Sequence, residues 1–442
     1  MKKPHQRLCA SLLCLAASIF MPQVQAQPPT APGTRMGCVF QGPTGKTFID
    51  AQRSRDQIAA DLKAAYAGSG SSRVADACLA GQLANMPAAV YQNLASKHPG
   101  KYAPLSPQAS STNSVGPAPA ARGPRNLPLN YAFIALDSAI PSGFLFFDPI
   151  GVSDSHKVIG TVYDNDGNPS LALYQSGMVK IMIAGAFVNA VSRQGVAAGA
   201  VVTDPINFYT QAAIFHGSST ELIPRAPDEV TSYVASVTDQ GTALVMSTDA
   251  TGINTAYLYQ NRKLRKLTFA SANYVVLTGM NNALTIVGWL STQPNVDTAF
   301  KFDANTGTTT LLPPLASNPS SWAIGINNLG DIVGYSFVFS GTENIGIWSG
   351  GRPFETYFTE GTAQIPTISN WLLINDARLI VITRTNDQQS YLIPTKGTRV
   401  LLSDYVNYDV ATYGTLSSVV GLNNFAELTG LTSFSYNFFL KP

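Results

Sequence analysis

Short apolar stretches separated by polar turns recur along the chain after about residue 150. One block reads VSDSHKVIG from Val152, INNLGDIVG from Ile326 and LNNFAELTG from Leu422. Further copies begin at Val191, Val237, Met280 and Ile374. A second block that contains or ends in aromatic residues follows most copies, as in TAFKF at Thr298 and NIGIW at Asn344, with SYLIP as its counterpart in the sixth unit. Seven copies of both blocks, spaced by 39 to 48 residues, predict one structural unit repeated seven times.

Each unit divides into four short strands. One strand leads into the polar turn, a second leaves it, the second block forms a third, and a fourth follows a Gly turn. Turn sequences such as Asn-Asn-x-Gly and Asp-Gln-Gly supply the positive φ that tight hairpins need. Four antiparallel strands every ~45 residues are typical of a propeller blade. A linear β-solenoid has shorter coils and parallel strands, and a two-sheet sandwich would not explain seven similar units. The predicted fold is therefore an all-β, seven-bladed β-propeller.

The two ends of the repeat region complement each other. The seventh unit ends after its third strand, at Phe438-Phe439-Leu440, and lacks a fourth. A strand-like segment, Asn130–Ile140, lies before the first unit and has no blade of its own. If this segment completes blade seven, the exposed sheet edges disappear. The propeller domain is predicted to span residues 129–442.

The repeats resemble those of the HAF family, probable extracellular repeat proteins of bacteria. The likeness lies in the I-N-N-x-G-x-x-V-G core at Ile326–Gly334 and in a segment with Ala299, Phe300 and Gly307, and it covers roughly residues 150–440. No unit here has His before its Ala-Phe pair, and the Asp-Leu-Gly usual in the family after the third strand is replaced by sequences such as Lys266-Leu267-Thr268. The resemblance implies an exported repeat protein and carries no functional residues with it.

The chain begins like a secretory signal peptide. A basic stretch, MKKPHQR, precedes an apolar run, LCASLLCLAASIF, and the small-residue site Val24-Gln25-Ala26 follows. The run is too short to span a bilayer stably, and no later run reaches ~18 apolar residues. We expect a signal peptide over residues 1–26, cleavage after Ala26, a periplasmic or secreted protein, and no membrane span in the mature chain.

A separate module is predicted ahead of the propeller. Residues 27–102 contain helical periodicity over 46–99, and residues 103–128 form a linker rich in Pro, Ser and Ala. Cys38 and Cys78 are the only cysteines after Ala26. In an oxidising compartment we expect a Cys38–Cys78 disulfide that links a small helical module, with two separate buried thiols as the alternative.

Composition restricts the kinds of partner. Only 12% of residues are charged and 45% are hydrophobic, which excludes a disordered or nucleic-acid-coating chain. After cleavage, 25 basic residues would face 26 acidic ones. This near-balance implies no nucleic acid partner.

Three common catalytic or cofactor-binding motifs are absent from the sequence. It contains no G-x-S-x-G elbow, H-E-x-x-H motif or dinucleotide fingerprint. Asp164, Asp166 and Asn168 alternate around Gly167 and form a weak calcium candidate, but they lack the downstream Glu of a calcium loop, so an Asp-Gly turn is favoured. We expect no cofactor other than this candidate calcium, and a protein that is not an enzyme.

Charge differs between the two faces of the predicted propeller. The loops between second and third strands and between blades (the loop face) carry twelve acids against two basic residues, together with several aromatics. Propellers usually bind ligands on this face. We expect ligand contacts from Tyr163, Asp204, Tyr209, Trp289, Tyr335, Glu343 and Asp387. The alternative is that these acids keep the protein soluble and the aromatics cap the blade cores.

Two functions fit this pattern. The first is an exported, non-catalytic binding or scaffold propeller whose ligand is a carbohydrate or a protein, because aromatic platforms with carboxylates suit hydroxyl and cationic groups. The alternative is a carbohydrate-active enzyme, a glycoside hydrolase or lyase, with two loop-face carboxylates ~5–10 Å apart. A shallow or plugged centre would favour binding over catalysis.

Overall fold

The computed structural model describes residues 37–40, 130–204, 209–250, 254–269, 272, 274–293, 296–338, 343–360, 371–384 and 389–442. The predicted signal peptide, the helical periodicity over 46–99, the linker and Cys78 all lie outside these residues, so the Cys38–Cys78 disulfide stays a prediction. Within the described part of the chain, no helix is long and apolar enough to cross a membrane.

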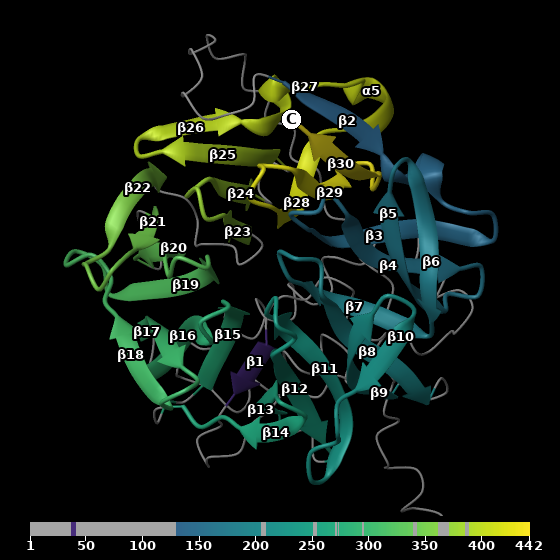
Figure 1. The fold of residues 1–442 in the computed structure, drawn as a ribbon. Coiled ribbons are helices and arrows are strands. Elements are labelled where there is room, and N and C mark those ends of the chain that lie inside the picture. The colour runs from purple at the N-terminus through teal and green to yellow at the C-terminus, as the bar shows by residue number, and fades with distance from the viewer. Residues whose placement is uncertain are drawn as a thin grey trace, which may run out of the picture.

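Seven sheets, antiparallel apart from one short edge pair, surround a central axis (Figure 1). Blades 1 to 3 consist of β3 (Phe144–Val152), β4 (Val158–Asp164), β5 (Pro169–Gln175), β6 (Met178–Ala184), β7 (Ala186–Val191), β8 (Ala197–Asp204), β9 (Tyr209–His216), β10 (Ser219–Leu222), β11 (Glu229–Val237), β12 (Ala243–Asp249), β13 (Asn254–Gln260) and β14 (Lys263–Lys266). Blades 4 and 5 consist of β15 (Tyr274–Met280), β16 (Thr285–Gln293), β17 (Val296–Asp303), β18 (Thr308–Leu312), β19 (Ser320–Ile326), β20 (Ile332–Phe337), β21 (Glu343–Trp348) and β22 (Glu355–Glu360). Blades 6 and 7 contain β23 (Trp371–Ile374), β24 (Ile380–Arg384), β25 (Gln389–Thr395), β26 (Thr398–Leu401), β28 (Leu416–Leu422), β29 (Leu428–Thr432) and β30 (Asn437–Lys441). The prediction of a seven-bladed propeller with four-stranded blades is confirmed.

Blade 7 is closed by a strand from the start of the domain. β2 (Tyr131–Ala135) pairs antiparallel with β30, with Phe133 opposite Leu440, and so supplies the missing fourth strand. The short β27 (Val406–Asn407) adds a parallel edge beyond β2. Figure 1 shows the first and last strands of the domain side by side in this sheet. The predicted closure is confirmed, and it joins both chain ends of the domain in one sheet.

One further strand reaches the propeller from the N-terminal region. β1 (Gly37–Phe40) pairs antiparallel with β15, the inner strand of blade 4, with Cys38 opposite Val276. It is the one described segment of the range predicted to form the helical module. The backbone of Cys38 is therefore held at the inner edge of blade 4.

Helical structure in the described residues is restricted to three single turns. They are η1 (Leu136–Ala139), η2 (Leu402–Tyr405) and α5 (Val410–Tyr413). The core lies between the blades, where buried side chains of adjacent sheets meet, as Trp289 of blade 4 and Trp322 of blade 5 do with ring centroids 5.1 Å apart. Burial of such apolar surface between sheets is the main stabilising contribution to this fold.

A β-bulge recurs at one position of the inner strand. The pairing register shifts by one residue in six blades, and the extra residue is Ile150, Asn189, Ala235, Thr278, Ile324 or Val420. Leu372 stands at the same place in the repeat of blade 6. We call this the bulge position. A bulged residue leaves the hydrogen-bond ladder and its side chain is re-aimed, which matters at the central axis.

The second strand of several blades carries a Gly after two apolar residues, as in Val333-Gly334, because the backbone of the inner strand lies very close to it. A Cβ at Gly334 would lie 2.0 Å from the carbonyl oxygen of Trp322, and one at Gly288 would lie 1.8 Å from that of Val276. The V-G of the repeat core thus lets the second strand pass the bulged inner strand.

Candidate functional site

Four residues expected to contact ligand on the loop face are buried. Tyr163, Trp289, Tyr335 and Glu343 are each at most 3% exposed. They lie within strands β4, β16, β20 and β21, where the blades pack together, and Tyr163 stacks on Phe146 at 4.9 Å. The prediction that they form an exposed platform is wrong, because the residue next to a strand's apolar run still faces the neighbouring blade.

The other expected contacts are not assembled into one site. Asp204 and Tyr209 are partly exposed and face each other across β8 and β9 of blade 2. Asp387 lies outside the described residues. The six described positions are divided among blades 1, 2, 4 and 5, so no compact loop-face site results from them.

The candidate calcium loop forms a turn. Asp164 accepts hydrogen bonds from the backbone N–H groups of Asp166 and Asn168, at 2.9 and 2.8 Å, and Gly167 has φ of 83°. Partial burial acts to raise the pKa of Asp164, but these donors together hold it below its usual range. Groups of three or more metal-ligating side chains do not occur among the described residues.

The turns between first and second strands form a hydrogen-bonded ring on the face opposite to the loop face. In six blades a side-chain oxygen accepts a backbone N–H from the turn of the preceding blade, at 2.9 to 3.1 Å. The acceptors are Asp154, Asp239, Asn282, Asn328, Asp376 and Asn424. We call this ring the turn belt. It explains the Asp or Asn at the third position of the repeated block.

A second set of bonds reinforces blades 4 to 7. The buried Asn327 accepts N–H groups of its own turn from Leu329 and Asp331 and donates to the carbonyl oxygen of Asn375 in the next blade at 3.0 Å. Asn281, Asn375 and Asn423 make the same inter-blade bond. In blades 1 to 3 the equivalent residues are Ser153, Ser192 and Thr238, whose hydroxyl groups bond within their own turns.

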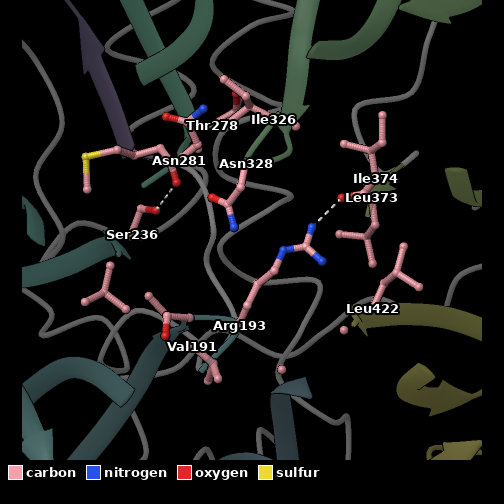
Figure 2. Close-up of a pocket in the computed structure, with 18 of the residues that line it drawn as sticks. Val191, Arg193, Ser236, Thr278, Asn281, Ile326, Asn328, Leu373, Ile374 and Leu422 are labelled. Carbon is pink, nitrogen blue, oxygen red and sulfur yellow. Dashed lines mark hydrogen bonds between the residues drawn. The ribbon is translucent and has the colours of Figure 1, made fainter. Parts of the chain in front are cut away.

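Blade 2 departs from the turn belt. Its third position is Arg193, which has no acceptor atom, so Asp154 N–H donates instead to the backbone carbonyl of Arg193 at 2.7 Å. The guanidinium crosses the central opening and donates to Asn424 Oδ1 at 2.6 Å and to the Ile374 carbonyl at 3.1 Å. Figure 2 shows Arg193 extending toward Ile374 across the pocket.

Inside this ring lies a central cavity of about 180 Å³. Inner strands of all seven blades line it, so it occupies the axis of the propeller. Apolar lining residues, such as Ile324, Leu372 and Ala235, occupy the bulge position. Asn328 and Thr278 add polar atoms to the lining (Figure 2). The volume is close to the ~150 Å³ cavity that holds one benzene ring, so it suits one small ring-shaped molecule.

Asn189 is the unusual residue of the cavity wall. It occupies the bulge position of β7, is fully buried, and neither atom of its amide has a hydrogen-bond partner. In blade 4 the equivalent Thr278 hydroxyl donates to the Ala323 carbonyl at 2.9 Å, with the Val287 carbonyl at 3.2 Å. A buried amide without partners costs ~1–3 kcal/mol of folding stability, so Asn189 calls for an explanation.

The cavity offers both donors and acceptors at low net charge. Arg193 has five N–H groups, makes two hydrogen bonds and lies 3.7 Å from Asp376 Oδ1, and Asn328 Nδ2 donates to no described residue. The hydroxyl of Ser236 donates to the Met280 carbonyl and its oxygen can still accept, whereas both amide atoms of Asn189 are buried. Asp239 is the one acid among the described lining residues, and its oxygens accept from Gln194 N–H and Asn282 Nδ2. The cavity therefore matches a small neutral molecule that both donates and accepts hydrogen bonds.

The residues that distinguish this cavity were visible in the sequence as departures from the repeat. Asn189 is the single amide at a position that elsewhere holds Ile, Ala, Thr, Leu or Val, and Arg193 is the single base at a position that otherwise holds Asp or Asn. They lie four residues apart in one unit. The prediction of the site by loop charge missed them, because two outliers do not change the charge of a face.

No family model matches the chain, and no curated protein matches it. Solved structures that resemble it include a streptogramin B lyase, 14% identical, with a TM-score of 0.44 over 71% of this chain and 98% of that chain. Virginiamycin B lyase from Staphylococcus aureus is 11% identical, with a TM-score of 0.44 over 70% and 98%. The Aleuria aurantia lectin is 10% identical, with a TM-score of 0.33 over 59% and 96%. These identities and TM-scores say nothing about ligands or activity, so the fold rests on the strand order above and the HAF resemblance stays a prediction.

Proposed function

We propose that this protein is an exported, non-catalytic binding propeller that holds one neutral sugar unit in its central cavity. The observation that carries the proposal is the meeting of Asn189 and Arg193, the two departures of blade 2, in the wall of one cavity. A neutral sugar hydroxyl both donates and accepts, which suits the spare donors of Arg193 and the hydroxyl oxygen of Ser236 in the same lining. Export is supported by the N-terminal sequence pattern alone.

The shape of the cavity supports a small ligand over a protein partner at this position. A cavity of about 180 Å³ is smaller than the ~300–1,000 Å³ of sites that bind drug-sized ligands. A protein partner would bury a much larger surface than this cavity offers. Apolar residues such as Ile324 and Leu372 give the carbon-bound faces of a sugar ring a surface to pack on.

The lining does not supply the pair of carboxylates that the hydrolase alternative needs. Asp239 stands alone among the described lining residues, and both of its oxygens accept hydrogen bonds from the turn belt. A glycosidase uses two carboxyl groups that flank the scissile bond. Binding is therefore the function that this geometry favours.

The test is calorimetric titration of the protein with glucose, galactose and N-acetylglucosamine. We expect one of them to bind wild-type protein, and Asn189→Val to weaken that binding at least tenfold. Tyr209→Ala, on the loop face, is the control and should leave affinity unchanged. If Tyr209→Ala lost affinity for the sugar and Asn189→Val did not, the ligand would bind on the loop face instead. If the same protein samples released reducing sugar from polysaccharides, the protein would be an enzyme.

A further inference from the structure

Seven exposed turn residues come directly after the third positions of the repeat, where the turn belt lies. Four of these third positions line the central cavity. The seven turn residues are Ser155, Gln194, Gln240, Ala283, Leu329, Ala377 and Phe425. We call this set the rim.

Polarity divides the rim into two halves. The members from blades 1 to 3 are polar, and those from blades 4 to 7 are apolar. Leu329 is 71% exposed and Phe425 56%, which places them among the most exposed large hydrophobic side chains of the described protein. Exposed apolar side chains beside a cavity mark a place where a ligand packs.

Phe425 is held in place beside the polar part of the cavity. Its neighbour Asn424 accepts the hydrogen bond from Arg193, and the backbone N–H of Phe425 donates to Asn423 Oδ1 at 3.0 Å. The His156 ring lies 5.1 Å from the Phe425 ring, and His156 Nδ1 is 2.9 Å from Glu427 Oε1. The backbone of Phe425 is thus fixed by a hydrogen bond and its ring contacts His156, while the residue stays 56% exposed.

We infer that the protein binds the end of a longer neutral carbohydrate chain, with the terminal unit in the cavity and the next unit on the Phe425 side of the rim. The inference rests on the proposed function. A second sugar unit joined to one in the cavity must leave through the mouth, where it passes the rim. There the apolar face of its ring meets Phe425, while its hydroxyl groups remain in water.

A carbohydrate suits this rim better than a protein segment. The seven rim residues carry no charge at all, and the apolar half consists of single side chains separated by polar belt residues rather than a continuous hydrophobic surface. Protein interfaces usually need a larger buried apolar core than this.

The experiment compares monomers with trimers on the full chain. The probes are glucose, maltotriose and cellotriose, and N-acetylglucosamine and its β-1,4-linked trimer, titrated into wild-type protein. In the series that binds, we expect the trimer to bind about tenfold tighter than the monomer, equal to ~1.4 kcal/mol. Phe425→Ala should abolish this difference while leaving monomer affinity unchanged, and Phe425→Tyr should keep it.

Phe434→Ala is the matched control. Phe434 is 60% exposed in the same blade but lies in the turn between β29 and β30, on the loop face. It should keep both the monomer affinity and the trimer advantage. Equal melting temperatures for the Phe425 and Phe434 variants exclude misfolding as the cause.

The outcomes separate the two proposals. A monomer that binds without any trimer advantage, or an advantage that survives Phe425→Ala, overturns the rim inference and leaves the cavity proposal standing. If no sugar of the panel binds wild-type protein, the cavity proposal fails and the inference fails with it. Trimer binding lost equally in Phe434→Ala would also overturn the rim position.

Discussion

Blades 2 and 5 share their four strands and their inner-strand bulge, but they differ at three corresponding positions. Blade 5 has Ile324 at the bulge, and Asn327 and Asn328 in the turn, all of which pack or hydrogen-bond within the protein. Blade 2 has Asn189, Ser192 and Arg193 at the same places. Asn189 leaves both of its buried amide atoms without hydrogen-bond partners, and Arg193 has more N–H groups than its two hydrogen bonds use.

The comparison shows how a repeat protein reveals its site. Six or seven copies of one unit define what the fold needs at each position. A residue that departs from the other copies and leaves polar atoms without hydrogen-bond partners is unexplained by the fold. The residues of blade 5 therefore show what the fold requires, and the two departures in blade 2 indicate a requirement of function.

The largest effect is expected where blade 5 follows the repeat. Asn327→Ala removes the acceptor of two turn N–H groups and the donors to Asn375 and Asp331, in a buried place. We expect the free energy of unfolding to fall by about 2–4 kcal/mol, measured by chemical denaturation. Gln240→Ala, an exposed member of another turn, should change it by less than ~0.5 kcal/mol. Equal effects of the two variants would mean that the buried Asn residues do not join the blades.

Blade 2 should respond in the opposite direction. Asn189→Val replaces a buried amide without partners by a side chain that other blades carry at the bulge position, such as Val420. We expect a rise of about 1–2 kcal/mol in the free energy of unfolding, together with the loss of sugar binding.

Thr278→Val is the matched control for this prediction. It makes the same kind of change at the same position of blade 4, where the hydroxyl bonds the Ala323 carbonyl. It should destabilise by about 1 kcal/mol. If both variants destabilise the protein, Asn189 has structural partners in solution and the contrast between blades fails.

A third departure, Asp148 in blade 1, lies away from the cavity lining and tests whether every departure is functional. It is buried with Oδ2 unpartnered, and burial raises its pKa well above the usual range. Since the folded state keeps the proton that the unfolded state releases, stability is greatest below the unfolded pKa of about 3.9 and is lost as pH rises toward the folded pKa.

The measurement for Asp148 is the free energy of unfolding between pH 4 and 7. Wild-type protein should lose up to about 1.4 kcal/mol per pH unit over the part of this range below the folded pKa. Asp148→Val introduces the residue that blade 4 carries at the equivalent place, Val276, so it should remove that contribution and leave sugar affinity unchanged. A variant with the wild-type pH profile would show that Asp148 is ionised in the folded protein.

The smallest change in stability is expected from restoring the repeat in the turn of blade 2. Arg193→Asn supplies the acceptor that blade 2 lacks, at the cost of the bonds to Asn424 and Ile374 and of the 3.7 Å ion pair with Asp376. We expect the free energy of unfolding to change by less than about 1 kcal/mol while sugar affinity falls at least tenfold. Destabilisation by several kcal/mol with unchanged affinity would make Arg193 a structural tie across the axis.

Much of the fold was determined by the sequence alone. The seven units, their four strands and the use of Asn130–Ile140 to close blade seven follow from local patterns, because period-two alternation and tight turns are properties of neighbouring residues. The position of β2 beside β30 confirms this. Even the Asn-Asn pair of the repeated block could be placed in a turn from sequence.

What the tertiary structure decided is which side chains the blades enclose. Trp289 and Tyr335 are apolar enough for a ligand platform and for a core, and only the packing of blade 4 against blade 5 shows that they belong to the core. Likewise, Asn189 and Arg193 are two outliers in one unit until seven inner strands meet at the axis and place both in the wall of the same cavity. Closure of the propeller brings together residues that are far apart in the sequence. No local sequence pattern shows which of these residues will become neighbours.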